Sequence, residues 1–256
     1  MDHYFLGLAL QNKGQTADLL SKARSHFDRA LDLDPDNVGA LVARAWVDVS
    51  FVAIWLSEDR VKRLLSAEAD LGKALRLRPE NSNARTALGV VRMFSNRAEQ
   101  GIAECDRALA IDRNLAAAHA WIGLRKHFVG RDEETEAHVL EALRISPRDT
   151  SAGAWTGVVG FAKLHSGRDE EAVAWLSRSV EHNPNNPLYH FCLAAARGRV
   201  GRIEEAREAA RTGLELEPNF SSARLRRSMT FSDNPIWLAG RERLYDGFRK
   251  AGLPEE

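Results

Sequence analysis

The sequence has few cysteines, no excess charge of either sign and no long apolar run. Of its 256 residues only Cys105 and Cys192 are cysteines, which is too few for a disulfide framework and fits a reducing compartment. Lysine plus arginine and aspartate plus glutamate each number 36. The cationic excess that nonspecific nucleic-acid binding or a polybasic membrane anchor needs is therefore absent, and we expect neither nucleic acid nor membrane as a partner.

The chain also has little that would direct it out of the cell or into a bilayer. Its N-terminus, MDHYFLGLALQNKG, has an acid at position 2, no basic region and no small-residue cleavage site, so a signal peptide is not expected. The longest apolar stretch, Phe51–Leu56, is far too short to cross a membrane. We therefore expect a soluble cytoplasmic protein.

Motifs of catalysis and cofactor binding are missing as well. The sequence contains no GxxxxGK[ST], no GxGxxG after a strand, no GxSxG and no HExxH. His127 and His165, one repeat apart, are expected on one inner surface. Packing is favoured there over metal ligation, because no carboxylate or cysteine joins the two histidines at ligand spacing. We expect no catalytic residue, cofactor or metal, and hence no enzyme.

What the sequence does contain is a repeat. The string GRDEE occurs at Gly130–Glu134 and Gly167–Glu171, and GRIEE follows at Gly201–Glu205. Segments that end like LDLDPDN are separated by 44, 34, 34, 37 and 34 residues, so two of the intervals contain insertions. The positions that mark these segments are Pro35, Pro79, Arg113, Pro147, Pro184 and Pro218.

A period of 34 residues is that of the tetratricopeptide repeat (TPR), whose pattern is W-x2-L-G-x2-Y…A-x3-F…P. Leu-Gly-like pairs occupy the matching positions, among them Leu88-Gly89 and Ile122-Gly123. Small residues stand five positions before each proline or its substitute, at Ala30, Ala74, Ala108, Ala142, Ser179 and Gly213. The chain therefore resembles the TPR family over about residues 1–220.

The resemblance implies an all-α fold, a right-handed superhelical solenoid of about six helix-turn-helix repeats with a C-terminal cap. Repeats are predicted over 1–37, 38–81, 82–115, 116–152, 153–186 and 187–220, and capping helices over 221–256. The insertion in the second repeat predicts longer helices there. In the tail, Asp233-Asn234-Pro235 predicts a helix start, with a cap residue followed by proline at the first helical position.

This register places GRDEE in the turn between the two helices of a repeat. Gly130, Gly167 and Gly201, with Asn96 as the substitute, are expected in left-handed backbone at the exit of the first helix. The acids then lie in the first turn of the second helix, where they complement the exposed N–H groups and the helix dipole. An architectural role is favoured over catalysis, and we expect the charged turns to point away from the apolar inner face.

In TPR proteins the first helices of the repeats line the concave face, where ligands usually dock. The register predicts a groove here that is apolar and aromatic, with almost none of the Lys, Arg and Asn that hold a chaperone's C-terminal carboxylate. An apolar or amphipathic protein segment suits such a groove, although packing of each residue on the next repeat is an equal alternative. The candidate groove residues are Trp46, Val90, Met93, Phe94, Leu124, His127, Phe128, Phe161, Leu164, His165, Phe191 and Arg199.

The leading hypothesis is therefore a non-enzymatic scaffold that binds a protein segment in this groove. The tail suggests an alternative, because RLRR and the closing FRKAGLPE resemble the end of TPR regions appended to bacterial class III adenylate/guanylate cyclases and winged-helix regulators. The first repeat, from Tyr4 to Asn37, carries the same resemblance. That likeness implies a regulatory or sensor module of a bacterial signalling protein, either free-standing or part of a longer chain.

Overall fold

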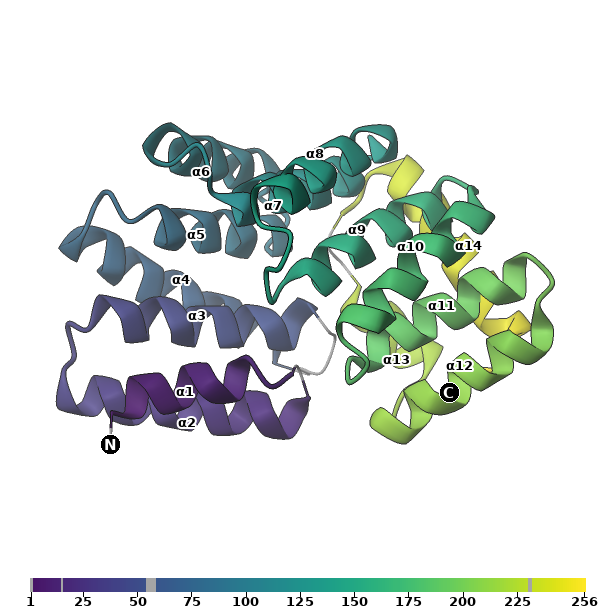
Figure 1. Cartoon of the computed structure of the whole chain (residues 1–256), viewed down its shortest axis with the longest axis horizontal. Helices are drawn as coiled ribbons and strands as arrows, with labels where there is room; N and C mark the ends of the chain where they lie inside the picture. Colours follow the sequence, from purple (N-terminus) through teal and green to yellow (C-terminus); the bar gives the residue numbers. More distant parts are fainter. Residues whose placement is uncertain (1, 15, 54–58, 230–231) are drawn as a thin grey trace. The chain divides into compact units, whose positions relative to one another are not determined.

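The computed structural model describes residues 2–14, 16–53, 59–229 and 232–256, and these residues form fourteen α-helices and no strand (Figure 1). The helices are α1 (His3–Gln11), α2 (Ala17–Leu33), α3 (Val38–Ala53), α4 (Arg60–Leu77), α5 (Ser82–Phe94), α6 (Ala98–Ile111), α7 (Ala116–Phe128), α8 (Asp132–Ile145), α9 (Ala152–His165), α10 (Asp169–His182), α11 (Pro187–Arg199), α12 (Ile203–Leu216), α13 (Ser222–Ser228) and α14 (Pro235–Lys250). None of the described helices is both long and apolar enough to cross a membrane.

The longer helices expected from the insertion are present in α3 and α4. These have 16 and 18 residues, against 13 or 14 in each helix from α5 to α12. The apolar stretch Phe51–Leu56 falls only partly in α3, because its last three residues lie outside the described residues.

The turns inside the helix pairs confirm the predicted role of glycine. Gly130, Gly167 and Gly201 have φ angles of +74°, +82° and +83°, and Asn96 has +57°. Left-handed backbone is open to glycine without a steric penalty, so the chain can leave one helix here and reverse into the next. The acids of GRDEE lie in the first turns of α8 and α10, as predicted.

At the turns before α3 and α5, asparagine starts the new helix. The Asn37 side-chain oxygen accepts the Ala40 N–H at 2.9 Å, and the Asn81 oxygen accepts the Ala84 N–H at 2.8 Å. These bonds satisfy N–H groups that have no partner inside the helix. Pro79 stands between α4 and α5, where it prevents the earlier helix from continuing.

Small residues allow the helices of a pair to pack closely. A Cβ atom added to Gly89 of α5 would lie 2.8 Å from the carbonyl oxygen of Gly101 in α6, so only glycine fits there. The small residues that stand five positions before each proline or its substitute are all buried: Ala30, Ala74, Ala108, Ala142, Ser179 and Gly213. The repeating small residues of the sequence are thus a packing requirement.

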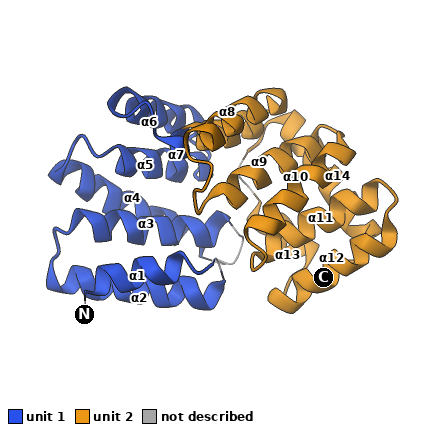
Figure 2. Cartoon of the chain, viewed as in Figure 1, with its two compact units in different colours: residues 1–118 blue, residues 119–256 orange. Residues whose placement is uncertain are grey.

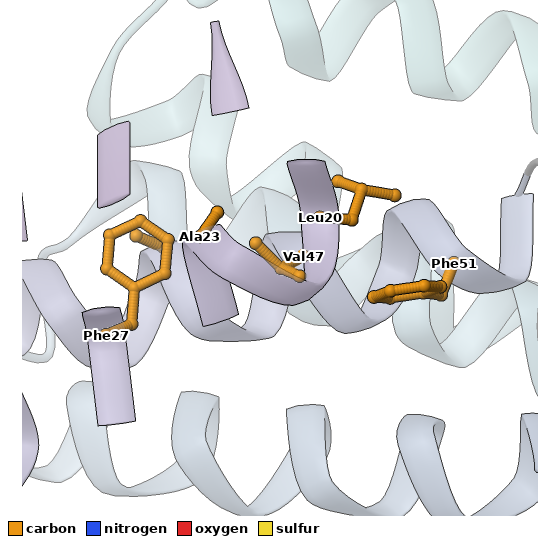
Figure 3. Close-up of a cluster of buried hydrophobic side chains, with 6 residues drawn as sticks. Leu20, Ala23, Phe27, Val47 and Phe51 are labelled. Carbon is orange, nitrogen blue, oxygen red and sulfur yellow. The ribbon is translucent and has the colours of Figure 1, made fainter. Parts of the chain in front are cut away.

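The chain divides into two compact units, unit 1 at residues 1–118 and unit 2 at residues 119–256 (Figure 2). In unit 1, α2 and α3 share an apolar cluster made of Leu20, Ala23, Phe27, Ala43, Val47 and Phe51 (Figure 3). Tyr4 and Leu8 of α1 pack against this cluster. The bounds of the six repeats stay a prediction, because compactness groups the helices into two units and does not mark the repeats.

Ion pairs tie successive helices of unit 1 together. Asp48 of α3 is almost completely buried and lies 3.0 Å from Arg24 Nε of α2 and 2.7 Å from Arg63 Nη1 of α4. Arg44 of α3 pairs with Asp28 of α2 and with Asp70 of α4, at 2.8 and 2.7 Å. Each of these α3 side chains therefore links the helix before it and the helix after it.

Unit 2 ends in α13 and α14, and α14 begins as predicted. Asn234 is its N-cap and accepts the Ile236 N–H at 2.9 Å, and Pro235 is its first residue. α14 packs against α9 and α11 (Figure 1), which are the first helices of their pairs. Beyond it the chain returns to α13, where the Ser222 N–H donates to the Pro254 carbonyl at 2.9 Å.

Candidate functional site

The candidate groove residues of unit 1 lie mostly in its interior. Val90 and Met93 of α5 are fully buried, and Phe94 is nearly so. Met93 packs on α6, because a Cβ atom added to Gly101 would lie 2.7 Å from Met93 Cγ. Trp46 of α3 is half-buried, and it is the one of these four residues with appreciable exposure.

The candidate groove residues of unit 2 lie on α7, α9 and α11. Phe161 and Arg199 are half-buried, whereas the other six are buried: Leu124, His127, Phe128, Leu164, His165 and Phe191. His127 and His165 lie side by side as predicted, with ring centroids 4.6 Å apart.

A helix of the same chain, α14, covers part of this surface. We call six of the residues that contact it, on α7, α9, α10 and α11, the docking face of unit 2. Four of them are among the candidate groove residues, Ala195 lies in the same register of α11, and Asp169 was not predicted there. The docking face consists of Phe128, Leu164, His165, Asp169, Ala195 and Arg199.

Aromatic contacts hold α14 along its length. The Trp237 side chain is fully buried, and its ring centroid lies 6.2 Å from that of Phe128 and 6.0 Å from that of His165. Near the other end, the Phe248 ring meets the edge of Phe220 at 5.6 Å. Burial of one large apolar side chain contributes about 1.5–3 kcal/mol, so these contacts are a substantial driving force for docking.

Two glycines let α14 approach closely. A Cβ atom on Gly240 would lie 2.6 Å from the His165 ring, and one on Gly247 would lie 2.6 Å from the Ala195 carbonyl oxygen. The first obstacle is a side chain, but the second is the backbone of α11, which cannot move aside independently of its helix. Gly247 therefore marks the tightest crossing of the two helices.

A short chain of ion pairs crosses from the docking face to α14. Asp169 Oδ2 lies 3.1 Å from Arg199 Nε and 3.1 Å from Arg243 Nη2. Arg199 Nη1 in turn donates to Asp246 Oδ2 at 2.6 Å. The side chains of Arg199 and Asp169 are 13% and 17% exposed, so water screens this pair much less than a surface pair.

Hydrogen bonds also fix the N-terminal end of α14 to the end of α7. Ser232 Oγ donates to the Phe128 carbonyl oxygen at 2.6 Å, and Asn234 Nδ2 donates to the Val129 carbonyl oxygen at 3.1 Å. These two acceptors belong to the last turn of α7 and the residue after it, where carbonyl groups lack partners inside the helix. The position of α14 is therefore set by polar contacts as well as by apolar packing.

Under α14 lies a group of buried titratable side chains. His127 Nδ1 is 2.6 Å from Asp132 Oδ1, and both side chains are buried. Neither ring nitrogen of His165 has a hydrogen-bond partner among the described residues. Burial, together with the nearby His127, Arg241 and Arg243, lowers the pKa of His165 well below its ordinary value of 6.5. His165 is therefore neutral at pH 7.

The expectation that the charged turns point away from the inner face was wrong for Asp132 and Asp169, whereas Glu133 and Glu170 are exposed. The first acid of each GRDEE turns inward: Asp132 bonds to His127, and Asp169 bonds to Arg199 and Arg243. Sequence reasoning missed both because it weighed the three acids together as dipole partners. The sequence signal that distinguishes the first acid from the other two is its position directly after the turn arginine. In GRIEE that position is occupied by the apolar Ile203, whereas both following acids are kept.

The two thiols are free and buried. Burial, with help from Asp106 and Glu104, raises the pKa of Cys105 to about 12. Burial also raises the pKa of Cys192 well above its ordinary value. A thiol kept protonated in this way is a poor nucleophile and a poor metal ligand. The described part of the chain holds no group of three or more side chains placed to bind a metal ion.

Comparison with known proteins gives the fold. No family model matches the sequence, and neither does any curated protein. Among solved structures, a thermophilic TPR protein of Thermus thermophilus matches with a TM-score of 0.60 and 18% identity, over 76% of this chain and 96% of that one. A tetratricopeptide repeat protein of Parabacteroides merdae matches with a TM-score of 0.61 and 14% identity, over 90% and 82%.

A third similar structure is human IFIT1, solved as a dimer with m7Gppp-AAAA. The match has a TM-score of 0.71 and 17% identity, and it covers 99% of this chain but 59% of that one. At such identities the likeness concerns the fold alone. Together with the helices described above, these comparisons establish an all-α, TPR-like helical solenoid.

Proposed function

We propose that the chain is a non-enzymatic scaffold that binds an apolar or amphipathic protein segment on the first helices of its repeats. One observation carries this proposal: the docking face of unit 2 already holds an amphipathic helix, α14, through aromatic, glycine and ion-pair contacts. A helix laid across packed helices is one of the recurring modes of peptide recognition. TPR-like folds in the similar structures agree with a role in protein interaction.

The charges of the docking face favour a helical segment over a terminal carboxylate. Its basic side chain, Arg199, lies between Asp169 and Asp246, so its charge is already balanced. A carboxylate clamp needs cations whose charge is not neutralised by the protein itself. The ligand that suits this face is therefore one with apolar contacts and a charge of each sign.

Partner capture from the native cell extract tests the scaffold function. Phe161→Asp places a charge on the half-buried ring that lies 6.5 Å from His127 and 6.4 Å from His165, and it should abolish capture while helicity is kept. Phe5→Asp is the control, since Phe5 is 64% exposed and lies in unit 1. Partners that bind the Phe161→Asp variant as well as the native chain would contradict the groove.

We also propose that nucleic acid and membranes are not partners and that the protein acts in the cytoplasm. The balance of 36 basic and 36 acidic residues supports this, because binding to phosphate backbones depends on a cationic surface. Titration of a labelled single-stranded RNA at 150 mM salt should give no saturable binding. Saturation at micromolar RNA would overturn this part of the proposal.

The alternative function is a regulatory or sensor module of a bacterial signalling protein. It is favoured by the tail, because the residues that carry the resemblance belong to α13, α14 and the closing segment, which pack together. Arg226 of α13 pairs with Glu242 of α14 at 2.9 Å, and the Ala223 N–H donates to the Glu255 carbonyl at 3.0 Å. A cyclase or winged-helix segment encoded next to this one would support the alternative, and its absence from the gene neighbourhood would count against it.

A further inference from the structure

The contact face of α14 follows a regular pattern. Trp237, Gly240, Leu244, Gly247 and Phe248 are all buried, and their spacing of three and four residues places them on one side of the helix. The large residues fill the space at the two ends and in the middle, while the glycines allow the close crossings.

Charged residues flank this contact face and pair with the docking face. Arg243 lies 3.1 Å from Asp169, and Asp246 lies 2.6 Å from Arg199. The two pairs have opposite polarity, so a helix laid down in the reverse direction would bring like charges together. The docking face thus selects both a sequence pattern and a helix direction.

The docking face remains electrically balanced when α14 is removed. Asp169 and Arg199 pair with each other as well as with α14, so neither would be left as a single buried charge. Two further hydrogen bonds, from Ser232 just before α14 and from Arg243 within it, end on the carbonyl oxygens of Phe128 and Leu164, near the ends of α7 and α9, where water can replace them. Removal of α14 therefore leaves no single buried charge on the docking face.

We propose that α14 is a displaceable occupant of the docking face, and that the partner that replaces it is a helix with the same contact pattern. That partner carries an aromatic residue at a first position, glycine three residues later, arginine after six, aspartate after nine, glycine after ten and an aromatic residue after eleven. The proposal rests on the proposed scaffold function and adds the sequence that the scaffold recognises. While α14 is docked, the fraction of molecules able to bind the partner is small, which weakens the apparent affinity by that fraction.

A synthetic peptide of residues 232–256, labelled with a fluorophore, tests this with the full chain as receptor. Fluorescence anisotropy should give weak binding to the native chain. Gly247→Leu should lower the dissociation constant at least tenfold, because the new side chain meets the α11 backbone at Ala195 and drives the tethered α14 off the face. Ala239→Leu, a similar enlargement on the exposed side of α14, should bind the peptide as the native chain does.

A second receptor variant keeps the test decisive if Gly247→Leu fails to fold. Arg243→Glu leaves the apolar contacts of α14 intact and opposes Asp169 with a like charge, so it should also tighten peptide binding, by a smaller factor. A peptide that carries Arg243→Glu should bind every receptor more weakly than the native peptide does. That result would show that the peptide binds at the position of α14.

Equal binding of the peptide to the native chain and to both variants, or to none of them while their helicity is native, would overturn the proposal. The scaffold function would still stand in that case if Phe161→Asp abolished partner capture, so the two failures are distinguishable. A dimer of the native chain that the peptide dissociates would identify a second copy as the occupant and would overturn the assignment to a separate partner.

Discussion

At the scale of single residues, His165 makes stability depend on pH. Its pKa in the folded chain lies well below 6.5, so the unfolded chain takes up a proton near pH 6.5 that the folded chain does not. Stability is therefore complete above pH 6.5 and is lost below it, by up to about 1.4 kcal/mol per pH unit, until the folded-state pKa is reached. Urea unfolding of the native chain between pH 7.5 and 5 measures this slope.

The His165→Phe variant isolates the effect. It replaces the titrating ring with one that cannot take up a proton. The free energy of unfolding should therefore decline less steeply below pH 6.5, by up to about 1.4 kcal/mol per pH unit. His182→Gln, which removes an exposed histidine of α10, serves as the matched control. An unchanged slope in His165→Phe would show that other groups carry the pH dependence.

Replacing a helical glycine with alanine should lower or raise stability, depending on which atoms lie beside the glycine. Gly89→Ala brings a Cβ atom to 2.8 Å from both Cys105 Sγ and the Gly101 carbonyl oxygen, and should cost about 1–3 kcal/mol. Gly72→Ala meets only the end of the Arg76 side chain, at 3.6 Å, and should stabilise by up to about 1 kcal/mol through helix propensity. Thermal unfolding of the two variants should shift the midpoint in opposite directions, and a shift in the same direction would contradict the packing explanation.

At the scale of elements, the ion pairs of unit 1 join one helix to the next. Asp48→Ala removes a buried carboxylate that two arginines share, and should destabilise by about 1–3 kcal/mol, since both guanidinium groups keep some contact with water. Asp18→Ala is the matched control, because the exposed Lys22–Asp18 pair contributes about 0.5 kcal/mol or less. Denaturant unfolding of both variants gives the comparison, and equal losses would rule out a special role for burial.

How much of an element could be predicted depends on how local its causes are. The left-handed Gly130 and Gly167, and the Asn234-Pro235 start of α14, follow from a few neighbouring residues and were predicted correctly. The surface on which α14 packs was not predicted, because the contacts of α14 join residues that are far apart in the sequence. Arg243 reaches a carbonyl 79 residues away, and Asp246 meets an arginine 47 residues away. No periodic pattern contains that information.

In the candidate groove, the direction of a side chain and its exposure have different causes. Phe128 and His165, which the register predicts on one surface, both contact Trp237, because the position of a residue on a helix fixes the direction of its side chain. Whether a side chain is exposed to solvent does not follow from the direction in which it leaves its helix. Val90 and Met93 occupy the predicted register but are fully buried, since what covers a helix face is decided by the rest of the fold.

At the scale of the whole molecule, charge balance governs colloidal behaviour. With 36 residues of each sign and a calculated isoelectric point near 7.1, the chain carries almost no net charge at pH 7. Its solubility should pass through a minimum there and rise on either side, because self-repulsion returns as the net charge grows. Precipitation with ammonium sulfate between pH 6 and 9 checks this, and a solubility that falls steadily across that range would contradict it.

The complete burial of Trp237 gives the molecule an optical reporter of its own. An indole packed between Phe128 and His165 emits at short wavelength, and the emission moves to longer wavelength when water reaches the ring. The difference in fluorescence between the native chain and Trp237→Phe isolates this one indole from the other five tryptophans. The departure of α14 can therefore be followed in real time, without an added label, during peptide exchange or acidification.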